Sequence, residues 1–408
     1  MSIVQFLGLV ISFATNITLL ISAIVVFIIC LIFFLECIAA LLPDKDIAYK
    51  GNWQNTKVTV LIPAHNEEIV IASTLEKIIP ALKKEDSVVV VADNCTDATA
   101  NIAREKGARV IERYDAVNRG KGYALDYGLC FLDSKPPDVV IFVDADCVVE
   151  NNAIELLTEW AIATQQPVQA SYLMKKAQNS HSSKDYISQF SIIIRNFVRL
   201  RGGAFFGFPS MLNGTGMAFP WSVIRRVNVA NAHLLEDLKL GMDLTIAGHK
   251  PIFCPEAKVM GYLPSSLQAS KNQKTRWEHG HLQLMQTYIP KLLKEAVSQK
   301  RFGLLLSIPD LFVPPLSLLV ITWLGTMVIS LFFGVLGVSW LATLIVSLGG
   351  LFFFTAILTA WYTFARKEFP LGELLAIPLY VLWKIPVYIK FIIKPEKKWI
   401  RTERENTP

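Results

Sequence analysis

The chain has 408 residues, of which 52% are hydrophobic and only 18% are charged. Soluble domains average about 25% charged residues, whereas the mean hydropathy of this chain is +0.41. These values exclude a disordered chain and a nucleic-acid-binding tail protein, and they disfavour a fully soluble enzyme. The six cysteines show no CxxC spacing. We therefore expect no disulfide framework, no zinc site and no nucleic-acid partner, and a reducing compartment.

The N-terminal 35 residues carry no charged side chain. Because a membrane span needs about 20 apolar residues, this stretch predicts one transmembrane helix at roughly 17–42. It lacks the basic start of a signal peptide, and its apolar run is too long for one.

The middle of the chain alternates strand-like and helix-like segments. Apolar or β-branched runs at 57–62, 87–91, 109–112 and 138–143 predict strands, and the segments between them predict helices. This alternation predicts an α/β fold with parallel strands and right-handed crossovers. Because the run at 87–91 is continuously apolar, we expect its strand to be buried on both faces.

Polar residues follow three of the predicted strands, at the sheet edge where ligands bind in such folds. They are residues 63–68, 92–97 and 144–146. The first two groups lead into helices, whose exposed N–H groups favour phosphate or a polar base edge. Asp144 and Asp146 suit a divalent cation, Mg²⁺ or Mn²⁺, that bridges a diphosphate. Solvated or helix-capping carboxylates are the alternative reading of this pair.

A second stretch without charge covers residues 311–365. It predicts two transmembrane helices, at about 311–333 and 339–363, and a buried helical hairpin in a soluble core is the alternative. Lys and Arg exceed Asp and Glu after residue 365. The positive-inside rule therefore places the middle of the chain and the C-terminus in the cytoplasm, at the plasma (inner) membrane, with the N-terminus outside.

Residues 371–393 are apolar but are interrupted by Pro378, Lys384, Pro386 and Lys390. We expect an amphipathic helix at the cytoplasmic interface, since a fourth span would put the basic tail outside. The predicted organisation is a transmembrane helix in 1–43, a cytosolic α/β domain in 44–300 with an interfacial helix at 267–300, two transmembrane helices in 301–365, and the interfacial helix and basic tail in 366–408.

Four sequence motifs occur in the order found in one enzyme family. They are residues 60–68 (VLIPAHNEE), 144–146 (DAD), 235–237 (LED) and 273–277 (QKTRW). On these motifs the chain resembles the membrane-bound family 2 inverting glycosyltransferases, the group that includes cellulose, hyaluronan and poly-N-acetylglucosamine synthases. The resemblance implies a GT-A fold, a Rossmann-like mixed sheet with flanking helices. Leu235 stands where the processive synthases usually have Thr.

The resemblance also implies a binding site for a UDP-sugar donor. The loop after the first strand would hold the nucleoside through Pro63, Ala64 and Glu67. Asp93 would bond to uracil, Asp144 would face the ribose or the metal ion, and Asp146 would bind the metal directly. Lys121, in a glycine-flanked loop, would reach the diphosphate. Simpler readings are a helix cap for Asp93 and a solvated lysine for Lys121.

Asp237, next to Glu236, is the residue that the resemblance implies as catalytic base. Inversion is a single displacement, in which an acceptor hydroxyl attacks the anomeric carbon from the face opposite the diphosphate. The hydroxyl is a poor nucleophile, so it needs a carboxylate within hydrogen-bond reach. The metal ion would stabilise charge on the departing diphosphate. Glu236 and Asp237 would also cap a helix at 238–248, which is the alternative reading.

Two further segments are expected to face the acceptor or the diphosphate. Gly214 and Gly216 give a backbone path without bulky side chains, which allows close approach of a ligand. A plain turn is the alternative. Gln273, Arg276 and Trp277 lie within about one helical turn and share a face. Trp277 would stack on a sugar ring and Arg276 would pair with the diphosphate, or both would anchor a helix at the membrane.

We therefore expect a hexosyltransferase that moves a sugar from a UDP-sugar to a membrane-associated acceptor, with Mg²⁺ or Mn²⁺ as cofactor and membrane lipids around it. The acceptor is a growing glycan, as in polysaccharide synthesis, or a lipid that receives one sugar. The motif at 273–277 favours a glycan acceptor, whereas Leu235, in place of the usual Thr, weakens the case for a glycan. A membrane subunit that binds nucleotide sugars without catalysis is the alternative of a different class, and the complete set of acids argues against it.

Overall fold

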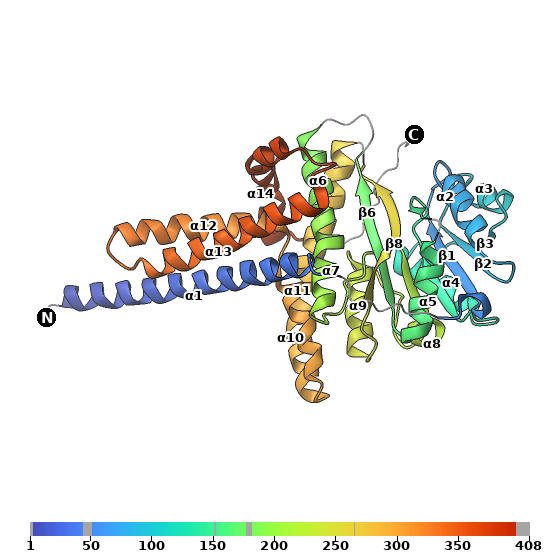
Figure 1. The fold of residues 1–408 in the computed structure, drawn as a ribbon, viewed down its shortest axis with the longest axis horizontal. Helices are drawn as coiled ribbons and strands as arrows, with labels where there is room; N and C mark the ends of the chain where they lie inside the picture. Colours follow the sequence, from blue (N-terminus) through green and yellow to red (C-terminus); the bar gives the residue numbers. More distant parts are fainter. Residues whose placement is uncertain (1–2, 44–50, 151, 177–181, 265, 397–408) are drawn as a thin grey trace.

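The computed structural model describes residues 3–43, 51–150, 152–176, 182–264 and 266–396 (Figure 1). The predicted basic tail at 397–408 lies outside these residues. The helices are α1 Ile3–Ala39, α2 Ile71–Ile78, α3 Thr99–Glu105, α4 Lys121–Leu132, α5 Ala153–Thr164, α6 Ser183–Ile193, α7 Arg199–Phe205, α8 Trp221–Ile224, α9 Glu236–Ile246, α10 Leu267–Ser298, α11 Ile308–Phe312, α12 Leu316–Val335, α13 Leu341–Ala360 and α14 Ile377–Ile393. The strands are β1 Val58–Ala64, β2 Ser87–Asp93, β3 Arg109–Arg113, β4 Val139–Phe142, β5 Val148–Val149, β6 Val168–Lys175, β7 Met217–Pro220 and β8 Ile252–Tyr262.

Within the described part of the chain, eight strands form one sheet in the order β3-β2-β1-β4-β7-β6-β8-β5. The first four in this order are parallel and are connected through α2, α3 and α4, as the alternation of strands and helices predicts. β7 runs antiparallel to β4, and β6 and β8 pair in parallel beyond it. The predicted fold class, a mixed α/β sheet with flanking helices, is confirmed.

Helices cover both faces of the sheet, so its central strands are buried on both sides. On β2, Val88 and Val90 belong to the apolar cluster on one face, which includes residues of α2 and α5. Val89 and Val91 belong to the cluster on the other face, which includes residues of α4 and α9. The prediction that this strand is buried on both faces is confirmed. The packing fixes the position of each strand end and of the polar residues that follow it.

Three long apolar helices, α1, α12 and α13, run side by side away from the sheet (Figure 1). Four described segments are long and apolar enough to cross a membrane: Val10–Ala39, Leu316–Val335, Leu341–Ala365 and Leu371–Ile393. The first two lie within α1 and α12, and the third consists of α13 and the five residues after it. The first three segments occur where the sequence predicts spans. α1 and α13 approach closely, because a Cβ added at Gly349 would lie 3.3 Å from the Cα of Phe27.

The fourth segment contains α14, the helix predicted to lie at the interface. In Figure 1, α14 lies beside the inner ends of α12 and α13, next to α6, and does not follow their length. Its buried Lys384 forms an ion pair with Glu278 of α10. The length and composition of the segment also allow a span, so the interfacial location and the topology stay predictions.

A buried ion-pair cluster joins α1 to the α/β domain. Arg199 on α7 donates from Nε to Oε2 of Glu36 at 2.6 Å and from Nη2 to Oδ1 of Asp310 at 2.5 Å. All three residues are buried. Gly202, almost one turn further along α7, packs directly on α1. A Cβ added there would lie 1.8 Å from the carbonyl oxygen of Glu36, so only glycine fits.

Gly202→Ala is expected to lower the free energy of unfolding by about 2 kcal/mol, because the added methyl group pushes α7 away from α1. Thermal unfolding of the detergent-solubilised chain would report this as a lower Tm. Gly203→Ala is the matched control, since its Cβ would meet only the side chain of Phe208, at 3.5 Å. Equal Tm values for the two variants would contradict the prediction.

Candidate functional site

A cavity of about 790 Å³ lies where β1, β2 and β4 end. Its size is typical of small-molecule sites. Every predicted site residue except Gly216 lines this cavity. These lining residues are Pro63, Ala64, Glu67, Asp93, Lys121, Asp144, Asp146, Gly214, Glu236, Asp237, Gln273, Arg276 and Trp277. Residues from distant parts of the sequence therefore meet in one site.

Gly216 lies outside the lining, which corrects the expectation that it faces a ligand. Its φ is +63°, and a Cβ added there would lie 2.8 Å from both the Cβ of Ala170 and the Cγ2 of Val259. Packing between β6 and β8 therefore requires a glycine at this position. Gly214, with φ +88°, does line the cavity.

Asp93 is the last residue of β2 and is 6% exposed. Its Oδ1 accepts hydrogen bonds from Nη1 of Arg113 at 2.7 Å and from Nδ2 of Asn94 at 3.0 Å. Arg113 ends the neighbouring strand β3, one residue after the predicted strand, and no motif marks it. The helix-cap reading of Asp93 is wrong, because Asp97 accepts the hydrogen bond from the backbone N–H of Thr99 at the start of α3.

Lys121 begins α4, and its ammonium group lies between two oxygen acceptors. Its Nζ donates to Oδ1 of Asp144 and, at 2.6 Å, to the backbone carbonyl of Gly214. Burial alone would lower the pKa of Lys121, but Asp144, Glu236 and Asp237 outweigh burial and raise that pKa. The side chain is 15% exposed, so the reading of a solvated lysine is wrong. Lys121 is a charged group held inside the cavity.

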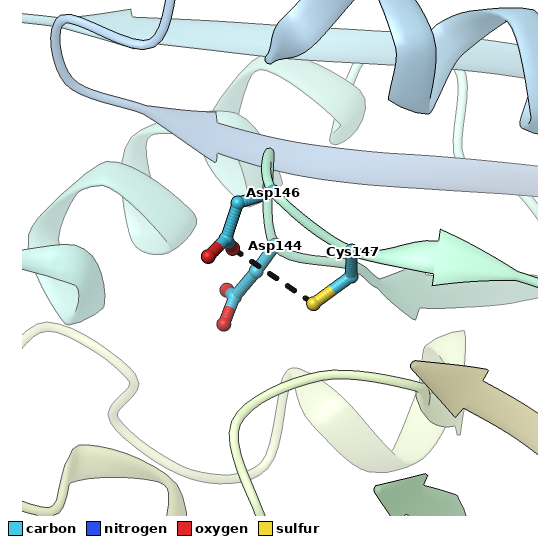
Figure 2. Close-up of side chains that lie close together, drawn as sticks. All are labelled: Asp144, Asp146 and Cys147. Atoms are coloured by element: carbon cyan, nitrogen blue, oxygen red, sulfur yellow. Dashed lines mark hydrogen bonds between the residues drawn. The ribbon is translucent and has the colours of Figure 1, made fainter. Parts of the chain in front are cut away.

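Asp144 and Asp146 follow β4 and form a candidate metal site (Figure 2). One carboxylate oxygen of each and the Sγ of Cys147 lie within 4.8 Å of one another. The Cys147 thiol donates to Oδ1 of Asp146 at 3.8 Å. Burial, together with Asp146 and Asp144, raises the pKa of that thiol well above its usual value. Mg²⁺ and Mn²⁺ prefer oxygen ligands and keep positions open for substrate, so the two carboxylates fit such a cation and Cys147 is no ligand.

A buried glutamine on β6, Gln169, holds the loop that faces Asp144. Its Oε1 accepts from the backbone N–H of Asn213 at 2.8 Å, and its Nε2 donates to the carbonyl of Thr215 at 3.0 Å. The Oγ1 of Thr215 in turn accepts from the backbone N–H of Asp144 at 3.1 Å. Gln169 is a supporting residue that the sequence does not reveal, because a single Gln in a strand has no chemical pattern.

Glu236 and Asp237 form the first turn of α9, where carboxylates are favoured by the helix dipole. The Oδ1 of Asp237 accepts from the backbone N–H of Leu238 at 2.8 Å, so this residue also stabilises the helix start. A Cβ added at Gly214 would lie 3.1 Å from Oδ2 of Asp237 and 3.3 Å from Nζ of Lys121. The second oxygen of Asp237 thus lies beside Gly214 and Lys121. Burial, with a contribution from Asp237, raises the pKa of Glu236 to about 7.

Glu236 is expected to make stability depend on pH. Its pKa of about 7 in the folded chain exceeds the ordinary 4.5, so the folded chain binds this proton more tightly than the unfolded chain. The resulting stabilisation is complete below pH 4.5 and is lost as the pH rises through about 7. Glu236→Gln is therefore expected to flatten the fall in Tm between about pH 5 and 8. Thermal scans of both proteins in one detergent would check this, and parallel Tm curves would refute it.

α10 connects the cavity to α14. Gln273, Arg276 and Trp277 line the cavity together, as their predicted shared face requires. The next residue, Glu278, accepts a hydrogen bond from the buried Lys384 of α14. α10 therefore carries the motif residues that line the cavity and is also joined to α14.

Residues 55–280 match the model of the family described as glycosyltransferase like family 2. The match covers more than half of the 408 residues. The chain belongs to this family.

Proteins similar to the chain include the following two curated relatives and one solved structure. A probable glycosyltransferase of Bacillus subtilis, YdaM, is 28% identical over 250 residues, which are 58% of each chain. The 4,4'-diaponeurosporenoate glycosyltransferase of Staphylococcus aureus is 32% identical over 145 residues, 35% of this chain and 36% of that one. The chain thus spans less than two thirds of either relative. The mannosyltransferase PcManGT from Pyrobaculum calidifontis, in complex with GDP-Man and Mn²⁺, is 16% identical with a TM-score of 0.54, covering 94% of this chain and 99% of that one. This similarity shows a shared GT-A-like fold.

Proposed function

We propose that the chain is an inverting glycosyltransferase that moves a hexose from a UDP-sugar to a membrane-associated acceptor. The observation that carries the proposal is that Asp93, Asp146, Asp237 and Arg276 line one cavity. Such a transfer needs groups that bind the nucleoside, a cation and the diphosphate, and a carboxylate that acts as general base. The family match supports sugar transfer as the reaction class. Membership in the synthase-like subgroup rests on the motifs.

The hydrogen bonds of Asp93 favour uracil over guanine. Its Oδ1 already accepts from Arg113 and Asn94, which leaves Oδ2 as the acceptor for a base. Uracil presents one N–H, at N3, between two carbonyl groups. Guanine presents two adjacent donors, which pair best with both oxygens of a carboxylate. The donor is therefore a uridine nucleotide, although PcManGT was solved with GDP-Man.

Asp144 and Asp146 would hold the Mg²⁺ or Mn²⁺ ion. When bound, such a cation stabilises the negative charge that develops on the departing diphosphate. Lys121, beside Asp144, and Arg276, on α10, add two positive groups that bind the diphosphate. The presence of Mn²⁺ in the PcManGT complex supports this class of cofactor.

Asp237 acts as the general base. Its Oδ2 lies beside Gly214, which has no side chain of its own and lines the cavity. The acceptor hydroxyl gives its proton to this carboxylate while its oxygen attacks the anomeric carbon. Trp277 offers an aromatic face for the sugar ring. Because the acids that catalysis needs all line the cavity, a subunit that only binds nucleotide sugars is the weaker alternative.

α1, α12 and α13 span the membrane in this proposal, with the α/β domain and the C-terminus in the cytoplasm. Three spans agree with the excess of Lys and Arg after residue 365. α14 then lies at the cytoplasmic interface, which agrees with its ion pair to α10 through Lys384 and Glu278. Two acceptor classes fit this arrangement: a growing polysaccharide, which the motif at 273–277 favours, and a lipid that receives one sugar.

The test uses the purified full-length chain in detergent with added lipids. Radiolabelled UDP-glucose, UDP-galactose, UDP-N-acetylglucosamine and GDP-mannose are each supplied with Mn²⁺, Mg²⁺ or EDTA. We expect release of UDP from a uridine donor, loss of that activity in EDTA, and inverted anomeric configuration in the product by NMR. Turnover of GDP-mannose alone, or a product with retained configuration, would overturn the proposal.

A further inference from the structure

Resting on the proposed function, we infer that the acceptor is an amphipathic lipid that receives a single sugar on a hydroxyl group. The cavity is chemically divided. Apart from Asp237, the charged residues that the mechanism uses serve the donor, and another part of the lining is formed by Tyr172, Met174, Leu234, Leu235 and Trp277. A glycan presents many hydroxyl groups that need hydrogen-bonding partners, whereas an alkyl chain needs an apolar surface. We call these five residues the acceptor wall.

Contacts join the acceptor wall into one surface. Trp277 packs against the apolar cluster that contains Leu235 and also against the cluster that contains Met174 and Tyr172. α10 lies close to the start of the wall, because a Cβ added at Gly280 would lie 2.7 Å from the Cγ of Leu235. The wall therefore runs continuously from the start of α9, across α10, to β6.

The wall begins next to the proposed base. Leu235 directly precedes Glu236 and Asp237. Leu235 presents an apolar side chain to the cavity and has no hydroxyl that could bond to a sugar. An acceptor whose hydroxyl group is held at Asp237 would have the rest of its molecule in the cavity that Leu235 also lines.

β6 and α6 lie between the acceptor wall and the bundle of apolar helices, α1, α12 and α13. On β6, Met174 belongs to the wall, and its neighbour Leu173 packs in the apolar cluster formed by α1, α6 and α13. On α6, Ile192 packs with Met174, and Ile193 belongs to that same cluster of the bundle. An alkyl chain on the wall would thus be separated from the helices that we place in the membrane only by β6 and α6.

In the described part of α1 and α13, the contact between the two helices is largely apolar. Apolar side chains buried there include Ala23, Phe33, Val346 and Phe353. Thr343 of α13 is a buried polar residue among them. Most hydroxyl groups of a polysaccharide would lack hydrogen-bonding partners there, and unpaired polar groups are strongly disfavoured in such surroundings. A lipid acceptor reaches the cavity without a path between these helices.

The proposed step balances without a further reactant. The lipid hydroxyl oxygen forms a bond to the anomeric carbon while the bond from that carbon to the diphosphate oxygen breaks. UDP leaves with the electron pair, and the hydroxyl proton passes to the carboxylate of Asp237 and then to water. The products are a lipid glycoside, UDP and one proton.

The experiment places the full-length chain in nanodiscs made with a total lipid extract from membranes of the source organism. The radiolabelled donor that shows turnover is supplied together with soluble oligosaccharides of the same sugar. We expect the label in the organic phase, with one sugar per lipid by mass spectrometry. Label in an aqueous polymer or on the oligosaccharides would overturn the inference and leave the proposed function intact. Absence of turnover with every nucleotide sugar would overturn the proposed function, and the inference with it.

Met174→Asn tests the acceptor wall itself, with Met211→Asn as the matched control. Both methionines are 3% exposed, but Met174 lines the cavity and Met211 does not. We expect Met174→Asn to raise the KM for the lipid at least about tenfold, since apolar contact with the acceptor is lost, while the Kd for UDP changes less than about twofold. Met211→Asn should change the KM for the lipid and the Kd for UDP by less than about twofold. Equal KM changes in the two variants would overturn the assignment of the wall.

Discussion

Asp237→Asn is expected to lower kcat by about 10²- to 10⁴-fold, the range that a positioned general base contributes. The amide has the size of the carboxylate and keeps an oxygen for the N–H of Leu238, so the start of α9 should persist. It cannot take a proton from the acceptor hydroxyl. Because Asp237 does not serve the nucleotide in the proposed mechanism, the Kd for UDP should stay within about twofold. Initial rates of UDP release at saturating donor, with calorimetry for UDP, would measure both quantities.

The matched control for this variant is Asp243→Asn, on the same helix. Asp243 accepts a hydrogen bond from the hydroxyl of Tyr288 at 2.8 Å and does not line the cavity. We expect normal turnover in that variant at a temperature where it is folded. If Asp237→Asn keeps more than about a tenth of the wild-type kcat, another group takes the proton.

Asp146→Asn is expected to reduce turnover by at least about 100-fold and to weaken Mn²⁺ binding at least about tenfold. The substitution removes the negative charge of one of the two carboxylates that converge after β4. Asp144 alone cannot compensate, because Lys121 already pairs with it. Turnover measured across a Mn²⁺ titration, together with electron paramagnetic resonance of free Mn²⁺, would separate the loss of binding from the loss of rate.

Asp138→Asn is the control for the metal site. Asp138 immediately precedes β4, at the end away from the cavity, where its Oδ2 accepts from the backbone N–H of Lys57 at 2.8 Å. We expect its Mn²⁺ dependence to match that of the wild type. An Asp146→Asn enzyme with an unchanged Mn²⁺ titration would show that the cation binds elsewhere or has no role.

The parallel half of the sheet could be predicted because its strands and helices appear as short, distinct patterns of residues in the sequence. The apolar runs at 57–62 and 87–91 each form a strand buried on both faces, and the helices between them follow the usual crossover. The other half has no such signal. β5 is two residues long, and β8 contains Pro255 and shifts its register against β6 after Ala170. These strands form because they pair with segments that are distant in the sequence, and a single sequence does not show such pairing.

Most cavity residues that bear charge could be predicted because chemistry limits which side chains can serve a diphosphate, a cation or a base. Arg119 also lines the cavity and was not predicted. Residues that support the charged cavity residues could not be predicted. Arg113 and Gln169 act through partners far away in the sequence. Gly216 was assigned to the ligand wrongly, because a glycine that relieves packing and one that admits a substrate, such as Gly214, look identical in a sequence.

The close packing of α1 against α13 has a consequence for the fate of the product. At Gly349 the two helices lie so close that an added Cβ would be 3.3 Å from the Cα of Phe27, so no sugar head group fits between α1 and α13 at this point. With the topology proposed above, a glycolipid made at the cavity stays in the cytoplasmic leaflet. Its appearance on the outer surface would then require a separate flippase, and a cell lacking that partner should accumulate the glycolipid facing inward.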